Sequence, residues 1–204
     1  MSDFTSWFSQ YWRYVAGLIG VCIVAFFIFR AASRSYKQYY KRYREQEKQI
    51  KHLVALKEKY QNLTESVIAE APDDELLEGT AMSYQLVLQK EDDMTAQFNL
   101  MSDEKKYIYA LDVFTQDKSL QVFFKENGSE LTKIIIPAMK LIGLDEAANV
   151  ADEIRLMYDE TDETTSINQS KIEKAESYFE NNSILTKIKL NAARYIKENA
   201  THFI

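Results

Sequence analysis

The sequence is poor in the residues that build cross-linked scaffolds, metal sites and catalytic centres. Its 204 residues include one cysteine, two histidines, two prolines and five glycines. A single cysteine excludes an intramolecular disulfide framework and any zinc site with several cysteine ligands. Two histidines, His52 and His202, leave little material for metal binding or acid–base chemistry. The scarcity of glycine and proline, with hydrophobic residues at 46%, favours a folded chain built of helices.

The sequence also lacks the short motifs that mark common active sites. It contains no Gly-x-Gly-x-x-Gly, no phosphate-binding loop and no nucleophile elbow. Carboxylates are abundant, and the densest acidic run is 159–163. A calcium loop starting there would need glycine at its sixth place and glutamate at its twelfth, which are Thr164 and Ser170. We therefore predict that the protein is not an enzyme and binds no cofactor or metal ion.

Charge divides the chain into three parts. Residues 1–29 have no net charge, residues 30–60 carry ten basic and three acidic residues, and residues 61–204 carry 14 basic and 27 acidic ones. The formal net charge of −6 hides this polarity. We predict three corresponding segments. They are a short N-terminus with a transmembrane helix (1–34), a basic and amphipathic juxtamembrane helix (35–71), and an acidic helical domain (73–204).

The apolar N-terminal part predicts a membrane anchor. Residues 14–29 contain no charged side chain. With the two alanines that follow Arg30, the run approaches the ~20 residues needed to cross ~30 Å of hydrocarbon. A cleaved signal peptide is the alternative, but the segment before Arg13 holds an acidic residue and no basic one. The anchoring side chains that we predict are Trp12, Tyr14, Phe26, Phe27, Phe29 and Arg30.

The basic stretch after the apolar run sets the orientation and suggests a lipid contact. The positive-inside bias places the N-terminus outside the cell membrane and the C-terminal domain in the cytoplasm. Basic residues interleaved with tyrosines bind either single-stranded nucleic acid or anionic lipid headgroups. Because this stretch starts within two turns of the predicted membrane helix, we expect contact with anionic headgroups and no direct nucleic-acid binding. The expected lipid contacts are Arg34, Lys37, Lys41, Arg42 and Arg44.

A short apolar seam follows the basic stretch. Leu53, Leu56, Tyr60, Leu63 and Val67 recur at spacings of three and four residues. This seam spans about two heptads, fewer than the three to four that indicate a coiled coil. Two interpretations stay open: a helix that forms a homodimer, or an amphipathic helix that packs on the following domain. The proline at 72 is expected to end the helix, because the residue before a proline disfavours the α conformation.

The acidic part predicts an all-α fold, a compact multi-helix domain. Apolar residues recur at helical spacing, and no segment shows the alternation of a half-buried strand. Ser102, Ser129 and Asp145 are expected to cap the helices that follow them. Pro137 lies inside one helix and is expected to kink it or to confine its start to an irregular turn. The expected helices are 73–88, 103–114, 120–125, 130–143, 147–158, 170–181 and 184–199.

Part of this domain resembles a known family. Residues 120–128 (LQVFFKENG), a following helix, 141–144 (LIGL) and 145–148 (DEAA) resemble, in order and spacing, the core of the bacterial DNA-mimic protein family. The resemblance covers about residues 73–204. It implies an all-helical domain that binds a DNA-binding regulator through an acidic surface imitating the phosphates of a duplex. The family's Asn-Gly-Gly turn corresponds here to Asp117-Lys118-Ser119.

Together these features predict a single-pass membrane protein whose cytoplasmic domain binds another protein, as an adaptor or by sequestering a regulator. Its acidic helical surface would recruit a soluble, basic partner. Two other hypotheses stay open: an immunity or antitoxin-type inhibitor of a toxin, and a structural envelope protein that dimerises through residues 46–67. The loop at 159–170 is expected to be the most exposed acidic segment, with partner contacts at Asp159, Glu160, Asp162 and Glu163.

Overall fold

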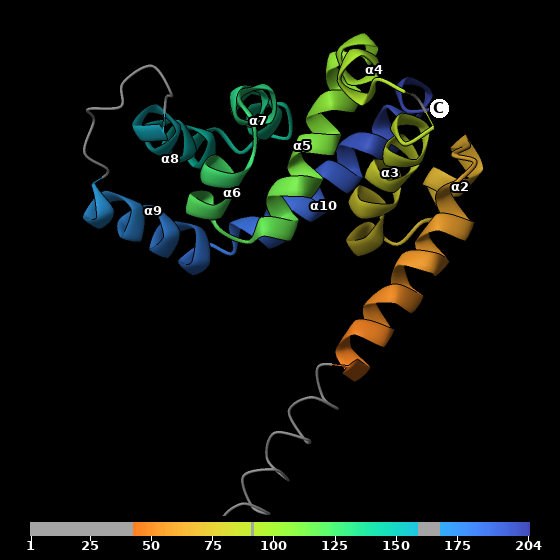
Figure 1. Ribbon diagram of the computed structural model, residues 1–204, viewed down its shortest axis with the longest axis horizontal. Coiled ribbons are helices and arrows are strands. Elements are labelled where there is room, and N and C mark those ends of the chain that lie inside the picture. The colour runs from red at the N-terminus through yellow and green to blue at the C-terminus, as the bar shows by residue number, and fades with distance from the viewer. Residues whose placement is uncertain (1–42, 91, 159–167) are drawn as a thin grey trace, which may run out of the picture. The chain divides into compact units, whose positions relative to one another are not determined.

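The computed structural model describes residues 43–90, 92–158 and 168–204, and within these ranges every regular element is a helix (Figure 1). The all-α prediction is confirmed for this part of the chain, which contains no strand. None of its helices is both long and apolar enough to span a membrane. The predicted anchor residues at 12–30 lie outside the described residues, as do the predicted lipid contacts at 34–42.

The chain divides into two units, residues 1–53 and 54–204. In the first unit the structure describes a helical segment from residue 43, on which Arg44 is exposed. In the second unit residues 54–60 are helical, and α2 (Glu65–Glu70) begins after Thr64. The hydroxyl of Thr64 accepts a hydrogen bond from the Val67 N–H at 3.4 Å. The prediction of one uninterrupted helix over 35–71 is therefore wrong, because this cap starts a new helix.

The part of the seam from Leu56 to Val67 contributes to the core of the second unit, whereas Leu53 is 44% exposed. Leu56 and Tyr60 are 2% and 0% exposed, and they belong to one hydrophobic cluster with Ile68 and Ala71. This burial supports the interpretation in which the seam packs on the following domain. The second compact unit accordingly begins at Val54.

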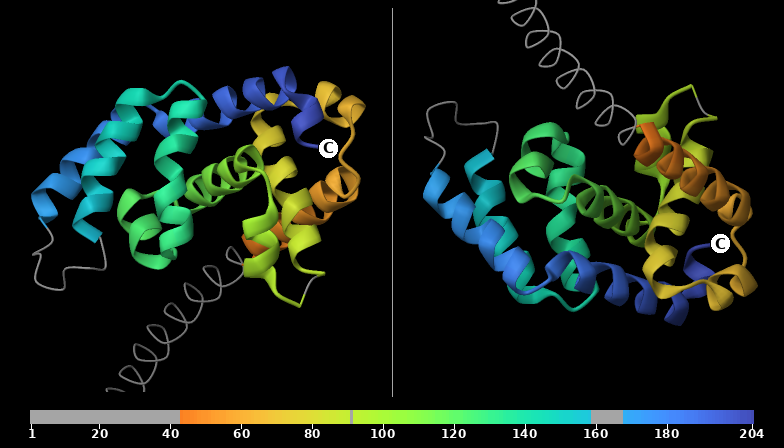
Figure 2. Two further views of the ribbon diagram at one scale, coloured as in Figure 1. Left: turned by 90° about the horizontal axis from the view of Figure 1, so that it is seen from above. Right: turned by 90° about the horizontal axis from the view of Figure 1, so that it is seen from below.

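The central helix of this unit is α5. It packs against α3, α7 and α10, and α10 also packs against α3. α7 in turn contacts α8, which lies beside α9 in both views of Figure 2. The bounds are α3 (Asp73–Leu88), α4 (Met94–Leu100), α5 (Asp103–Asp117), α6 (Leu120–Glu126), α7 (Ser129–Leu141), α8 (Asp145–Arg155), α9 (Gln169–Asn181) and α10 (Ile184–Glu198), with 3₁₀ turns at Leu156–Tyr158 and Ala200–His202.

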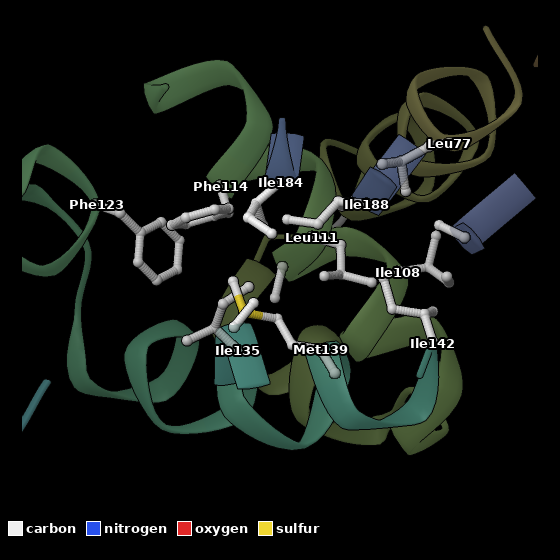
Figure 3. Close-up of a cluster of buried hydrophobic side chains, with 14 of the residues drawn as sticks. Leu77, Ile108, Leu111, Phe114, Phe123, Ile135, Met139, Ile142, Ile184 and Ile188 are labelled. Atoms are coloured by element: carbon white, nitrogen blue, oxygen red, sulfur yellow. The ribbon is translucent and has the colours of Figure 1, made fainter. Parts of the chain in front are cut away.

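The core forms where three of these helices meet. Leu111 of α5, Met139 of α7 and Ile188 of α10 are all fully buried and lie together at its centre (Figure 3). Each fully buried aliphatic side chain of this size contributes ~1.5–3 kcal/mol relative to its exposed state. The inward face of α3 repeats at helical spacing, and all its members are buried: Leu76, Leu77, Thr80, Tyr84 and Leu88.

The helix starts only partly follow the predicted caps. Ser102 caps α5, accepting from the Lys105 N–H at 3.5 Å. Ser129 and Asp145 are the first residues of α7 and α8, so their prediction as caps is wrong. In each case the cap is the preceding residue, Gly128 or Leu144. Ser129 and Asp145 therefore lie in the first turn, where the negative charge of Asp145 interacts favourably with the helix dipole. α7 runs through Pro137 without an irregular turn, because burial of its neighbours offsets the ~3 kcal/mol cost of an internal proline.

Candidate functional site

The predicted acidic contacts, Asp159, Glu160, Asp162 and Glu163, lie outside the described residues. The described residues before this segment end at Tyr158, and those after it begin at Asn168. The side-chain oxygen of Asn168 caps α9 by accepting a hydrogen bond from the Lys171 N–H at 3.2 Å. The candidate site is therefore built from the elements on which this acidic segment ends. These are α8 with its 3₁₀ turn on one side and α9 on the other.

Tyr178 of α9 presents a polar tip next to a carboxylate of α8. Its hydroxyl donates to Glu146 Oε2 at 3.4 Å, and its ring packs edge-on against Phe179 at 6.0 Å. Burial and the negative charge of Glu146 both raise the pKa of Tyr178. The hydroxyl therefore stays protonated and remains a hydrogen-bond donor.

Tyr158 lies in a similar setting at the end of the 3₁₀ turn. Its ring stacks on Phe124 of α6 with a centroid separation of 6.5 Å and an interplanar angle of 22°. Burial and, to a smaller extent, the negative charge of Glu176 raise the pKa of Tyr158. Two partly buried tyrosines beside carboxylates thus mark what we call the tyrosine face, formed by α8, the turn Leu156–Tyr158 and α9.

A cavity of about 420 Å³ opens beside α9, between the end of α5, the start of α6 and the start of α10. We call it the α9 cavity. Its lining combines apolar side chains with charged and hydroxyl groups. The apolar residues are Phe114, Leu120, Phe179 and Leu185, and the polar ones are Lys118, Ser119, Glu176, Glu180, Ser183 and Thr186.

Glu176 is fixed in position by the start of α6. Its Oε1 accepts hydrogen bonds from the Ser119 hydroxyl at 2.6 Å and from the Gln121 N–H at 3.0 Å. Ser119 also caps α6, with its oxygen accepting from the Val122 N–H at 3.3 Å. A carboxylate at this place is favoured by the unpaired N–H groups and the positive end of the helix dipole.

Two residues of the cavity lining hold a left-handed backbone. Lys118 has φ 59° at the end of α5, and Ser183 has φ 51° at the start of α10. In the described ranges they are the only residues other than glycine with positive φ. This conformation costs non-glycine residues ~1–2 kcal/mol. At Lys118 this conformation ends α5, as it does in many helices, and at Ser183 it turns the chain from α9 into α10.

Asp112 is a buried carboxylate away from the cavity lining. It lies on α5 and is 6% exposed. Burial and the neighbouring Glu78 of α3 raise its pKa to about 7, against the opposite effects of Lys189 on α10 and of a hydrogen bond from Gln116 Nε2 at 2.7 Å. Asp112 therefore changes charge near neutral pH, inside the packing of α3, α5 and α10.

The sequence gives no direct signal for the most structured parts of this site. Ser119 is recognisable as a cap before an apolar run, but Glu176, which accepts its hydrogen bond, lies 57 residues away. Asp112 does carry a signal that sequence analysis missed. It stands one helical turn after Ile108 and directly after Leu111, so it shares the apolar face of its helix.

Within the described ranges, no three His, Cys, Asp or Glu side chains lie close enough together to hold a metal ion. In the described residues the candidate site consists of the tyrosine face and the adjoining α9 cavity. Comparison of the whole chain with protein-family models, curated proteins and solved structures finds no match.

Proposed function

We propose that this protein is a membrane-anchored, cytoplasmic binding module that recruits or sequesters a soluble basic protein through its tyrosine face. The observation that carries the proposal is the hydrogen bond from Tyr178 to Glu146, together with the ring of Tyr158 that stacks on Phe124. Both tyrosines lie on the elements joined by the acidic run 159–163.

The chemistry of such a face suits protein recognition better than catalysis. Tyrosine offers a large apolar surface and a hydrogen-bonding tip, and it is enriched at the energetic centres of interfaces. Partial burial of both rings fixes them before binding, so less side-chain entropy is lost when a partner docks. The excess of 27 acidic over 14 basic residues from 61 to 204 would speed the encounter with a basic partner.

The membrane part of the proposal rests on the sequence. The uncharged run 14–29 would span the bilayer once, with the N-terminus outside and the domain in the cytoplasm. The basic residues that follow it, including the exposed Arg44, would contact anionic headgroups. This arrangement would hold the binding domain close to the membrane.

The resemblance to DNA-mimic proteins supports sequestration of a DNA-binding regulator as the form of binding. Lys118 holds a left-handed backbone at a position where that family has glycine. This backbone conformation is one that glycine adopts readily. An acidic surface of this kind would compete with DNA for the basic surface of the regulator.

Neutralising the acidic segment is expected to weaken capture of the partner at least tenfold at low salt. The variant changes Asp159 and Asp162 to asparagine and Glu160 and Glu163 to glutamine. Loss of several rim charges slows encounter, and each exposed pair contributes ~0.2–1 kcal/mol. The measurement is a pull-down of full-length tagged protein from detergent-solubilised membranes, treated with nuclease, at two salt concentrations and read by mass spectrometry.

The matched control removes four negative charges elsewhere on the chain and is expected to keep capture near the wild-type level. It changes a set of exposed acidic residues, Glu58, Glu65, Glu70 and Asp92, to their amides. Equal capture by the wild type and the segment variant at low salt would overturn the proposed role of the segment. Recovery of the protein alone would instead favour a structural anchor.

A further inference from the structure

We propose that the α9 cavity receives an arginine side chain, with Glu176 as the counter-ion of its guanidinium group. The inference rests on the proposed function in one respect, since it takes the incoming group to belong to a basic partner. It adds the chemical group that is recognised and the place where that group enters the domain.

The carboxylate of Glu176 is prepared for a cation. Ser119 and Gln121 both donate to Oε1, so the carboxylate is held before any ligand arrives. Among the described residues, both hydrogen bonds found for this carboxylate are to Oε1, which leaves Oε2 for a ligand. Guanidinium donates several N–H groups in a planar fork, and its hydrogen bonds to carboxylates are about twice as strong as neutral ones.

The apolar part of the lining suits the aliphatic stem of arginine. Phe114 and Phe179 meet edge-on in the wall of the cavity, with ring centroids 5.8 Å apart and an interplanar angle of 67°. Because these rings are only 1% and 5% exposed, they form an apolar wall for the stem and leave the guanidinium group to the carboxylate, and guanidinium is less strongly hydrated than ammonium. The volume of about 420 Å³ falls within the ~300–1,000 Å³ of pockets that hold small ligands.

The balance of charge in the lining argues against other occupants. Glu176 and Glu180, one helical turn apart on α9, face a single basic residue, Lys118. An anionic ligand would meet two carboxylates, and an apolar ligand would desolvate them without giving them a partner. A cation pairs with both, while Lys118 lowers the negative potential that attracts it.

Two substitutions with opposite expected effects test the assignment. Glu176→Gln keeps an oxygen that accepts from Ser119 and Gln121 but removes the charge. We expect it to weaken arginine binding about five- to tenfold. Lys118→Asn removes the competing cation and tolerates the left-handed backbone, so we expect binding about two- to fivefold tighter. Glu173→Gln, on an exposed position of α9 outside the lining, changes the charge equally and is expected to change binding less than twofold.

The experiment is a saturation-transfer NMR titration of full-length protein in detergent micelles. The probe is N-acetyl-arginine methylamide, and N-acetyl-citrulline methylamide serves as a neutral analogue of the same shape. We expect millimolar binding of the arginine probe and at least tenfold weaker binding of the citrulline probe. Far-UV circular dichroism of each variant checks that the helices are intact.

Several outcomes overturn the inference. They are absence of arginine binding, equal binding of the two probes, or equal losses in the Glu176 and Glu173 variants. If any of these occurs while the full-length protein still captures a basic partner at low salt, the cavity assignment fails and the proposed function stands. If arginine binds and depends on Glu176 while no partner is captured, the cavity assignment stands and the proposed function fails.

Discussion

Replacing Gly79 by alanine is expected to destabilise the domain by about 3 kcal/mol, although alanine is the better helix former. Gly79 lies in the middle of α3 directly beneath Tyr60. A Cβ atom added there would overlap three atoms of the Tyr60 ring, far inside van der Waals contact. Because Tyr60 is fully buried, its ring has no free space to move into. Urea unfolding followed by circular dichroism would measure the loss.

The same substitution is expected to change sign when the ring is absent. In a Tyr60→Ala background, Gly79→Ala should stabilise by ~0.5–1 kcal/mol, the ordinary gain for replacing glycine inside a helix. The comparison forms a double-mutant cycle between residues in contact. An equal cost of Gly79→Ala in both backgrounds would show that the close approach of Tyr60 is not the reason for glycine here.

The close contact also explains how residues 54–60 are held against the domain. Lys59 Nζ lies 2.5 Å from Glu75 Oε1, and Glu75 stands one turn before Gly79 on α3. The ion pair is partly exposed and contributes little by itself. The buried ring over a residue without a side chain therefore supplies most of the attachment, since close packing of an aromatic group buries a large apolar area.

Local sequence patterns predicted the two C-terminal helices well. The expected spans 170–181 and 184–199 differ from α9 and α10 by one residue at one end of each. The cap predictions at Ser129 and Asp145 were each wrong by one position. Each residue was predicted to precede its helix, and each is the first residue of that helix. A serine or aspartate before an apolar run is compatible with the cap and with the first turn, and only the backbone geometry distinguishes them.

The seam at 53–67 shows where local patterns stop being informative. An apolar face at heptad spacing is buried equally well by a second chain or by the same chain, so its sequence leaves the partner open. The residue that distinguishes packing against the same chain from packing against a second chain is Gly79, which lies against the ring of Tyr60. Nothing in the sequence around Gly79 indicates this contact. The α9 cavity is harder still, because Ser119 and Glu176 meet only through the packing of α6 beside α9.

Asp112→Asn is expected to stabilise the domain above neutral pH and to flatten its dependence on pH. The ordinary pKa of the side chain is near 3.8, and burial raises it to about 7 in the folded domain. Between these values the folded chain keeps a proton that the unfolded chain has lost. The free energy of unfolding therefore falls as pH rises from about 4 to about 7, by up to ~4 kcal/mol, and this contribution is constant above that range.

The measurement is urea unfolding of wild type and variant between pH 5 and pH 8. Asparagine is neutral throughout and keeps an oxygen that accepts from Gln116, so the variant should gain most at pH 8 and least at pH 5. Asp92→Asn, at an exposed position, is the matched control and should follow the wild-type curve. Parallel loss of stability in wild type and Asp112→Asn would contradict the assignment.

The two charged neighbours of Asp112 allow a second test, because they shift its pKa in opposite directions. Glu78 raises the pKa of Asp112 and Lys189 lowers it, from α3 and α10 respectively. Glu78→Gln should therefore move the pH at which stability levels off downward, and Lys189→Met should move it upward. If both substitutions moved that pH in the same direction, altered packing rather than charge would control the titration. Opposite shifts would show that the junction of α3, α5 and α10 is least stable when Asp112 carries its charge.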